Sequence, residues 1–441
     1  KLSTAITWQF CREAENIMPI MSSELITKAA AARAATRDLR NLPTDKKNAG
    51  LEAIASALES QQSAILEANA RDMEAGRTAG LTDVSLDRLM LNEGRLIAMA
   101  ADVRTIESLP DPIGETFDGR TLENGLRVER RRVPLGVIGT IYESRPNVTV
   151  DIAALCLKSG NTVVLRGGKE AVHSNSALAA LVRAALRTAG ISPEVVQQIN
   201  DTDRAIVEQM IKANDYIDLI IPRGGAGLVN YVAQEATVPA ITGGIGVVHT
   251  YADATADLVK AVEIVFNSKV QRPTVCNALD TLLVHSVVAP SLLPLIAARL
   301  SAAGVEMRCE QRALSLTGLV NKDLVKAAEP GDFGQEFLAL VLSVRVVDSL
   351  DEALKHIEDH GSGHTETILS QDDTAINRFL DEVDAAMVMV NASTRFNDGA
   401  QLGLGAEVAI STNKLHARGP MGLRELTSYK WVARGDGQVR R

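Results

Sequence analysis

The alternation of apolar and polar residues divides the chain into three kinds of segment. From Ser22 to about Arg104, apolar residues recur every three or four positions and Ala, Leu, Glu and Arg dominate, which predicts helices throughout. Residues 115–133 alternate apolar and charged residues around the turn pair Asn124-Gly125, so we expect a β ribbon there. From Gly136 onward, short apolar runs alternate with helical stretches.

This strand-and-helix rhythm starts a second time after the glycine-rich stretch VPAITGGIGVVHTY. Apolar strands separated by helices indicate parallel sheets covered on both faces. The expected fold class is therefore α/β, with two doubly wound domains and a small β element. The expected limits are 21–114 with 134–250 for the first domain, 251–422 for the second, 115–133 with 423–441 for the β element, and 1–20 for an extended start outside the fold.

Composition and charge exclude several classes of protein. The 441 residues are too many for one ordinary core. A net charge of -9 with 3% aromatic residues argues against nucleic-acid binding. The most apolar window, 281–300, contains two prolines and a histidine, so it is expected to be a strand and a helix rather than a membrane span. Four scattered cysteines without a CxxC pair indicate a reducing, cytoplasmic environment.

Four predicted strand ends carry paired glycines or cations. Ligands of open α/β sheets bind beyond the carboxyl ends of the strands. The four stretches are Glu143-Ser144-Arg145-Pro146-Asn147, Arg166-Gly167-Gly168-Lys169, Arg223-Gly224-Gly225-Ala226-Gly227 and Thr242-Gly243-Gly244. Paired glycines let backbone amides approach a phosphate-bearing ligand such as a dinucleotide. An ordinary turn explains any single pair equally well.

Two residues are candidates for covalent chemistry, each with a structural alternative. Asn147 follows Pro146 at a predicted helix start, where it is either a helix cap or an oxyanion donor. Cys276, in the stretch RPTVCNALD, is either a buried structural cysteine or a nucleophile. A cation such as Arg272 close to its thiol would lower its pKa.

Histidines spaced by four residues raise the question of a metal site. His356, His360 and His364 would share one face of a continuous helix. Gly361 and Gly363 end that helix after His360, so we interpret the histidines as a solvated helix end and expect no metal. The run Arg130–Arg132 is interpreted as a solvated or inter-subunit surface, with anion binding as the alternative.

Several stretches together resemble the aldehyde dehydrogenase superfamily, in particular its members that reduce acyl phosphates. They run from about Arg131 to Trp431. They are RRVPLGVIGTIYESRPNVTVDIAALCLKSGNTVVLRGGKEA, DLIIPRGGAGL, VPAITGGIGVVHTY, RPTVCNALDTLLVH, VNASTRFNDG and GLGAEVAISTNKLHARGPMGLRELTSYKW. The resemblance implies that the first domain binds the cofactor, that the second is catalytic, and that the β element joins subunits of a homo-oligomer.

The resemblance also implies roles for individual residues. Cys276 matches the catalytic cysteine, and Asn147 matches the asparagine that binds the oxyanion together with the cysteine's own amide. The implied cofactor residues are Arg166, Gly167, Gly168, Lys169, Gly224, Gly225, Glu336 and Phe337. NAD-linked relatives often carry a glutamate where this chain has Lys169, which suits a 2'-phosphate and favours NADPH.

One departure from the family pattern bears on the reaction. Relatives that oxidise aldehydes carry a glutamate before the glycine pair as a base for hydrolysis, but here the stretch reads Ala240-Ile241-Thr242-Gly243-Gly244. The absence of this base favours reduction over hydrolysis. The reaction that the resemblance implies is NADPH-dependent reduction of L-glutamyl 5-phosphate to L-glutamate 5-semialdehyde and phosphate through a thioester at Cys276, the second step of proline biosynthesis. A hydrolytic or other acylating aldehyde dehydrogenase is the alternative.

The implied substrate is a small molecule that is anionic at both ends. The cations in the matching stretches are Arg145, Arg272, Arg395 and Arg418, and one or more of them is expected to bind its phosphate or α-carboxylate. A transient contact with glutamate 5-kinase would protect the labile acyl phosphate. Neither nucleic acid nor a membrane is expected as a partner.

Overall fold

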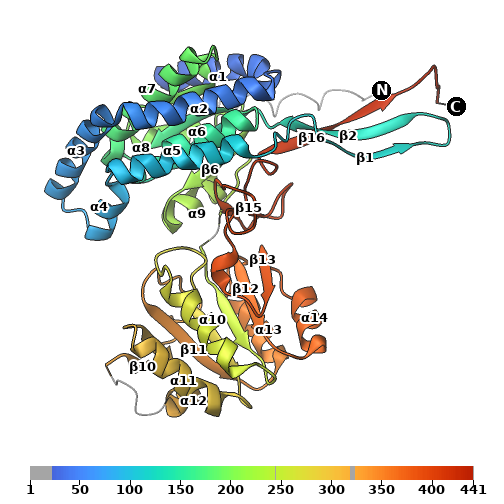
Figure 1. Ribbon diagram of the computed structural model, residues 1–441. Helices are drawn as coiled ribbons and strands as arrows, with labels where there is room; N and C mark the ends of the chain where they lie inside the picture. The colour runs from blue at the N-terminus through green and yellow to red at the C-terminus, as the bar shows by residue number, and fades with distance from the viewer. Residues whose placement is uncertain (1–21, 244, 318–322, 441) are drawn as a thin grey trace, which may run out of the picture.

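The computed structural model describes residues 22–243, 245–317 and 323–440. Two α/β lobes lie one above the other, and a long β ribbon projects sideways from the first lobe (Figure 1). Residues 1–20 and Gly244, which enter the expectations above, lie outside the described residues. No helix in the described part of the chain is both long and apolar enough to cross a membrane.

The first lobe contains a four-stranded parallel sheet in the order β5-β4-β3-β6. Its strands are β3 (Val137–Tyr142), β4 (Thr162–Gly167), β5 (Val196–Gln198) and β6 (Leu219–Arg223). Its helices are α1 (Ser23–Arg40), α2 (Thr44–Ser60), α3 (Gln62–Thr78), α4 (Asp83–Leu89), α5 (Glu93–Ser108), α6 (Asn147–Lys158), α7 (Val172–Thr188), α8 (Arg204–Met210) and α9 (Ala226–Glu235). The helices predicted from Ser22 onward are confirmed.

Helices cover both faces of this sheet. Ile138 and Tyr142 of β3 belong to a core shared with α2, α5, α6 and α7. Val137 and Ile141 of the same strand belong to a second core with α1, α8 and α9. Successive residues of a strand point to opposite faces, so the four large apolar residues of β3 pack under helices on both sides of the sheet, which explains the apolar run.

The second lobe repeats this plan around seven parallel strands in the order β10-β9-β11-β8-β7-β12-β13. They are β7 (His249–Ala252), β8 (Thr281–His285), β9 (Glu306–Cys309), β10 (Val325–Ala327), β11 (Val341–Val347), β12 (Thr365–Leu369) and β13 (Met387–Val390). One face packs against α10 (Leu258–Val270), α11 (Ala289–Ser301) and α12 (Gln311–Leu316), and the other against α13 (Leu350–His360) and α14 (Asp373–Glu382). The predicted strand and helix within 281–300 are confirmed.

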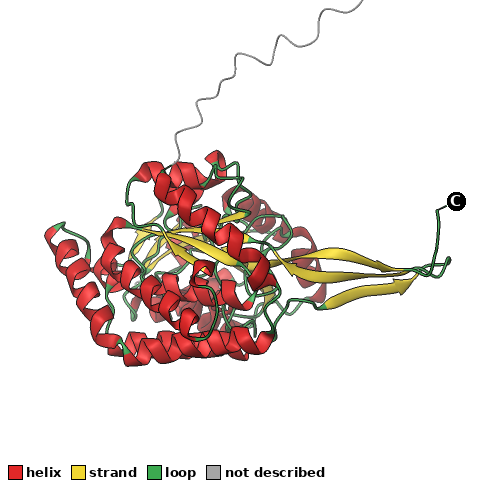
Figure 2. Cartoon of the chain, turned by 90° about the horizontal axis from the view of Figure 1, so that it is seen from above, coloured by secondary structure: helices red, strands yellow, loops and turns green. Residues whose placement is uncertain are grey.

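The ribbon is an antiparallel sheet of three strands. It consists of β1 (Thr116–Thr121), β2 (Arg127–Pro134) and β16 (Thr427–Arg434). Seen from above, it extends well beyond the helices (Figure 2). Gly125 has a φ of 84° in the turn between β1 and β2, a conformation that glycine adopts without strain. Arg130 stacks 4.7 Å from the ring centroid of Tyr429 and 4.8 Å from that of Trp431.

The polypeptide passes between the two lobes at two places. β7 lies wholly in the second sheet, so the change of lobe falls before His249 rather than between residues 250 and 251. Val408, Ala409 and Met421 join the core of the first lobe, so the end of the range 251–422 packs away from the second sheet. The short pair β14 (Ile410–Ser411) and β15 (Gly419–Pro420) lies in this returning segment.

Candidate active site

The candidate residues gather between the carboxyl ends of the first sheet and the amino ends of the second. Arg223 ends β6, and Arg145 lies between β3 and α6. Cys276 lies in the loop that precedes β8. The charges of both arginines act on the Cys276 thiol. The two lobes therefore contribute different chemistry to one site, cations and helix starts from the first and the thiol from the second.

The Cys276 thiol is half-buried and lies close to the backbone of Gly246. A Cβ on Gly246 would lie 1.8 Å from the Cys276 carbonyl oxygen. Burial raises the pKa of the Cys276 thiol to about 11, the positive charge of Arg223 opposes this shift, and the carboxylates of Glu336 and Glu407 add to it. The lowering effect of a nearby cation is present through Arg223, but desolvation outweighs it, so the pKa of the free thiol is raised.

Four arginines gather at the thiol: Arg145, Arg223 and Arg395 interact with the charge of Cys276, and Arg272 interacts with Arg145 and Arg395. Partial burial lowers the pKa of Arg145 to about 10, and the charges of Arg223, Arg88 and Arg272 lower it further, although part of the side chain remains exposed. Arg395 interacts with the charges of Arg272 and Cys276, and its Nε donates to Gln271 at 2.8 Å. Within the described residues, Arg145, Arg223 and Arg272 have no carboxylate partner. Such a cluster is arranged for an anion that comes from outside the chain.

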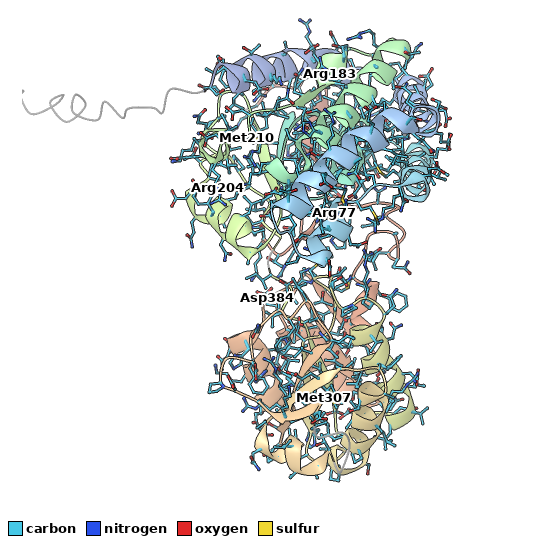
Figure 3. The ribbon with its side chains drawn as sticks, turned by 90° about the vertical axis from the view of Figure 1, so that its left-hand side faces the viewer. Arg77, Arg183, Arg204, Met210, Met307 and Asp384 are labelled. Atoms are coloured by element: carbon cyan, nitrogen blue, oxygen red, sulfur yellow. The ribbon has the colours of Figure 1, made fainter. Side chains whose placement is uncertain are left out.

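Arg418 lies apart from this cluster. Its Nη1 donates to Asp384 Oδ1 at 2.6 Å, and its Nη2 donates to the Asp384 carbonyl at 3.2 Å. Asp384 lies on the side of the second lobe that faces the first (Figure 3). Of the four arginines expected to bind the substrate, the structure brings three together around Cys276 and pairs the fourth with a carboxylate.

Asn147 is the first residue of α6 but does not cap it. Its side-chain Nδ2 donates to Asp151 Oδ2, one turn further along the helix, at 2.8 Å. The cap alternative is therefore wrong, and the amide lies at the site edge of the helix. Burial raises the pKa of Asp151 to about 7, and the negative charge of Asp102 on α5 adds to this rise. The hydrogen bond from Asn147 and the positive charge of Arg223 oppose it.

In the turn after β4, which is expected to bind the cofactor, some residues already contact other parts of the chain and one is free. The Arg166 guanidinium donates to the carbonyls of Thr202 at 2.7 Å and Asp203 at 3.2 Å, so it holds the loop before α8. Gly167 packs so closely that a Cβ would lie 2.0 Å from Asn175 Nδ2. Lys169 is exposed and has no side-chain partner among the described residues. It is the cation in this turn that remains free for a ligand.

The β6 turn already holds an anionic oxygen. The Gly225 N–H, at the start of α9, donates to Glu143 Oε2 at 2.9 Å. A Cβ on Gly224 would lie 2.6 Å from the Glu143 carboxyl carbon, so the Glu143 side chain packs directly on this glycine. A carboxylate at a helix start is stabilised by free amides and the helix dipole. This position therefore suits a phosphate oxygen once Glu143 moves away.

Glu336 and Phe337 lie at the amino end of β11. Glu336 Oε1 accepts from the Gly246 N–H at 3.1 Å, and burial raises the pKa of its carboxyl. The Phe337 N–H donates to Asp280 Oδ1 at 3.2 Å. The Phe337 ring lies under Lys269 and Arg308, whose charged groups are 5.9 and 5.2 Å from its centroid. Glu336 thus binds the residue that packs against Cys276, whereas Phe337 serves packing.

Sequence reasoning missed several side chains of this site. Arg223 was considered only as part of a glycine turn, and Arg88 lies on α4, in a region without catalytic motifs. Glu407 interacts with the charges of Cys276 and Arg223, and burial raises its pKa to about 7. For Asp151 a signal existed, because it is a single carboxylate in the otherwise apolar stretch VTVDIAAL.

The stretch that lacks the hydrolytic glutamate is held by an asparagine. The Thr242 N–H and hydroxyl both donate to Asn413 Oδ1, at 2.7 and 3.0 Å. Ile241 is buried, and Ala240 pairs with Ile220 at the edge of the first sheet. No carboxylate therefore stands at Ala240–Gly243, the described part of this stretch.

The predicted solvated helix end at His356 is wrong. His356 and His364 are 3% and 1% exposed, because the end of α13 packs on β7. The His356 ring lies 5.5 Å from that of His249 and 4.5 Å from that of His360. Burial lowers the pKa of His356 to about 2 and that of His364 to about 4. Within residues 22–243, 245–317 and 323–440, no three His, Cys, Asp or Glu side chains are arranged to hold a metal.

Comparison with known proteins identifies the class of enzyme. The family model "Aldehyde dehydrogenase family" matches residues 16–329 and 333–432. The chain belongs to this family and is an oxidoreductase. The predicted fold class is confirmed.

Three of the similar proteins share one name. The chain is 56% identical over 417 residues to the gamma-glutamyl phosphate reductase of Dehalococcoides mccartyi (strain CBDB1), which covers 95% of this chain and 98% of that protein. It is 57% identical over 415 residues to the enzyme of the same name from Roseiflexus castenholzii, with 93% and 98% covered. A crystal structure of gamma-glutamyl phosphate reductase from Thermotoga maritima has a TM-score of 0.92 at 45% identity, covering 95% of this chain and all (100%) of that one.

Proposed function

We propose that this chain reduces L-glutamyl 5-phosphate to L-glutamate 5-semialdehyde and phosphate, with NADPH as reductant, in the biosynthesis of proline. The relatives named gamma-glutamyl phosphate reductase support this substrate. The observation that carries the proposal is the cluster of Arg145, Arg223 and Arg272 around Cys276, without carboxylate partners in the described chain. An acyl phosphate brings the negative charge that this cluster lacks.

The chemistry begins at the Cys276 thiol. Because its pKa is about 11 in the free protein, attack requires a proton acceptor, and Glu407 with a carboxyl pKa of about 7 is the candidate. The sulfur bonds to the acyl carbon while the Asn147 amide and the Cys276 N–H bind the oxyanion. The bond to the phosphate oxygen then breaks, phosphate leaves with the electron pair, and the thioester remains.

The residues present fit a phosphorylated nicotinamide cofactor. Lys169 supplies a free cation for a 2'-phosphate, and the Gly225 N–H already binds an anionic oxygen. Glu336 lies against the loop of Gly246, at the site expected for the nicotinamide ribose. When bound, NADPH supplies the hydride that reduces the thioester to the aldehyde. Release of the Cys276 thiolate from the reduced carbon frees the product.

Hydrolysis of the thioester is the second candidate, because Glu407 is a titratable carboxylate within electrostatic reach of Cys276. Such a group can activate water as well as accept the thiol proton. The two functions differ in their need for phosphate, since only the reductase uses phosphate to cleave the thioester in the reverse direction.

The reverse reaction therefore tests the proposal. Glutamate semialdehyde, NADP+ and phosphate are mixed with the enzyme, and NADPH is followed by absorbance with and without phosphate or arsenate. We expect NADPH to form steadily only when one of these anions is present. Equal rates without either anion would assign the chain to hydrolysis. Cys276→Ala should lose turnover while keeping NADP+ binding, and turnover by this variant would exclude the thioester.

We also propose that the chain forms a homo-oligomer through the ribbon. Tyr429 and Trp431 are 44% and 51% exposed on β16, and the ribbon extends away from the lobes (Figure 2). Exposed aromatic residues on a projecting sheet are typical of interface surfaces. Light scattering of the full chain and of Trp431→Ala tests this, and a monomer at all concentrations would exclude it.

A further inference from the structure

The site described so far contains cations for the phosphate and the carboxylate, but the proposed substrate also carries one positive charge. This charge is the α-ammonium group of the glutamyl moiety. A pocket of unpaired arginines repels an ammonium group, so its binding requires a carboxylate that no arginine occupies. Arg223 acts electrostatically on two carboxylates whose pKa is raised by burial, Asp151 and Glu407.

We propose that Asp151 binds the α-ammonium group of the substrate and thereby selects an amino acid derivative over a plain acyl chain. The inference rests on the function proposed above and names a specificity residue for it. Asp151 lies on α6 one turn after Asn147, and the bond of 2.8 Å between the two side chains puts them on the same side of that helix.

Asn147 and Asp151 are neighbours on one side of α6, and their bonded side-chain atoms lie 2.8 Å apart. One turn of an α-helix advances by about 5.4 Å along its axis. In an extended glutamyl chain, about 5 Å separates the reacting carbonyl carbon from the α-nitrogen, because four bonds of about 1.5 Å lie between them. An acyl oxygen at Asn147 therefore brings the ammonium group within reach of Asp151.

The bonding state of Asp151 supports this role. Only its Oδ2 accepts a hydrogen bond within the described residues, and Oδ1 is neither bonded nor sealed from solvent. Neither Asp151 nor its acidic neighbour Asp102 forms an ion pair with any described residue. Two interacting carboxyl groups without an ion pair in the described chain, of which Asp151 also feels the more distant charge of Arg223, form a position that attracts an incoming ammonium group.

Glu407 is less suited to the ammonium group. Its Oε2 accepts from the Gly399 N–H at 3.0 Å, so it fixes the loop that returns to the first lobe. Its charge also acts on the Cys276 thiol, which reacts at the opposite end of the substrate. The ammonium group must lie three carbons away from the reacting carbon, on the side of Asp151.

The test compares two aldehydes that differ only in the amino group. L-Glutamate 5-semialdehyde and its deamino analogue 5-oxopentanoate are each assayed with NADP+ and phosphate, with wild type and Asp151→Asn. The asparagine keeps an oxygen that accepts from Asn147 and removes only the charge. We expect kcat/KM for the amino substrate to fall about 10- to 100-fold, mainly through KM. For the deamino substrate we expect a change of less than about threefold.

Two further variants sharpen the comparison. Asp102→Asn should weaken the preference for the amino substrate in the same direction but less. Asp381→Asn, on the exposed face of α14, is the matched control and should leave the ratio of the two kcat/KM values unchanged. The amino aldehyde cyclises in solution to the same extent in every assay, so this loss cancels when variants are compared with wild type.

The remaining outcomes overturn the proposal. An equal loss for both aldehydes in Asp151→Asn would mean that Asp151 only positions Asn147. An unchanged preference, or a wild type that does not distinguish the two aldehydes, would mean that the ammonium group binds elsewhere or is not read. Failure of the proposed function itself has a different signature, since NADPH would then form without phosphate.

Discussion

The α-carbon of Gly246 lies directly against the Cys276 carbonyl, so that a methyl group on residue 246 would lie 1.8 Å from that oxygen. The Gly246 N–H is also held by Glu336 at 3.1 Å, and the next N–H, that of Val247, by Ser362 at 2.9 Å. The catalytic loop therefore has a fixed backing on the second lobe. Any side chain at residue 246 must displace the loop that carries the thiol.

We therefore predict that Gly246→Ala loses at least about 100-fold in kcat while the protein stays folded, because a shift of the nucleophile by about 1 Å costs that much. Gly331→Ala, in the loop before β11, is the matched control, since a Cβ there meets no atom within 4 Å. It should keep full activity. Steady-state kinetics and thermal unfolding of both variants are the measurements. Wild-type activity in Gly246→Ala would contradict the close backing.

The second prediction concerns the ionisation of Cys276. With a thiol pKa of about 11, the thiolate fraction of the free enzyme rises about tenfold per pH unit between pH 7 and 10, and alkylation follows the thiolate. Iodoacetamide labelling of the Cys276 peptide, measured by mass spectrometry, should rise with this slope. A rate that levels off below pH 8 would show that the nearby cations lower the pKa of the Cys276 thiol by more than burial raises it. Cys276→Ser provides the background.

The third prediction tests the arginine cluster. Arg223 acts on Cys276, Asp151 and Glu407 alike, so it is the cation at the centre of the site. Arg223→Gln should raise the KM for phosphate in the reverse reaction about 10- to 100-fold, because one charge-assisted hydrogen bond to phosphate is lost. It should also slow alkylation of Cys276, because a positive charge that favours the thiolate is gone. Arg187→Gln on the exposed end of α7 should change neither value.

The sequence pattern predicted the parts of the molecule that depend on neighbours along the chain. Buried strands such as β3 appear as apolar runs, and Asn124-Gly125 marks the ribbon turn. The arginine cluster depends instead on residues far apart in sequence, because α4, β6 and the loop of Cys276 meet only in the folded chain. The burial of His356 on α13 also depends on a residue far away in sequence, since its ring packs against His249 on β7.

The fourth prediction concerns the choice of cofactor. Lys169 is exposed at the end of β4 without a side-chain partner in the described chain, so its charge is available for a 2'-phosphate. Lys169→Ala should lower the ratio of kcat/KM for NADPH to that for NADH by about tenfold or more, because one charge-assisted contact is lost only for NADPH. Lys260→Ala on α10 is the control. An unchanged ratio would assign the 2'-phosphate to other groups.

The last prediction is a pH dependence of stability caused by His364. Its pKa is lowered by burial to about 4 in the folded chain, against about 6.5 in the unfolded chain. Below about pH 6.5 the unfolded chain binds a proton that the folded chain does not, so stability falls as the pH falls. Relative to His364→Gln, wild type should lose about 1.4 kcal/mol per pH unit between pH 6 and 4.5. The comparison with the variant is necessary because Asp151 and Glu407, whose pKa values are raised, shift stability in the opposite direction over the same range. Urea unfolding of both proteins at several pH values measures the difference, and a constant difference from pH 7 to 4.5 would show that His364 is charged or accessible in the folded chain.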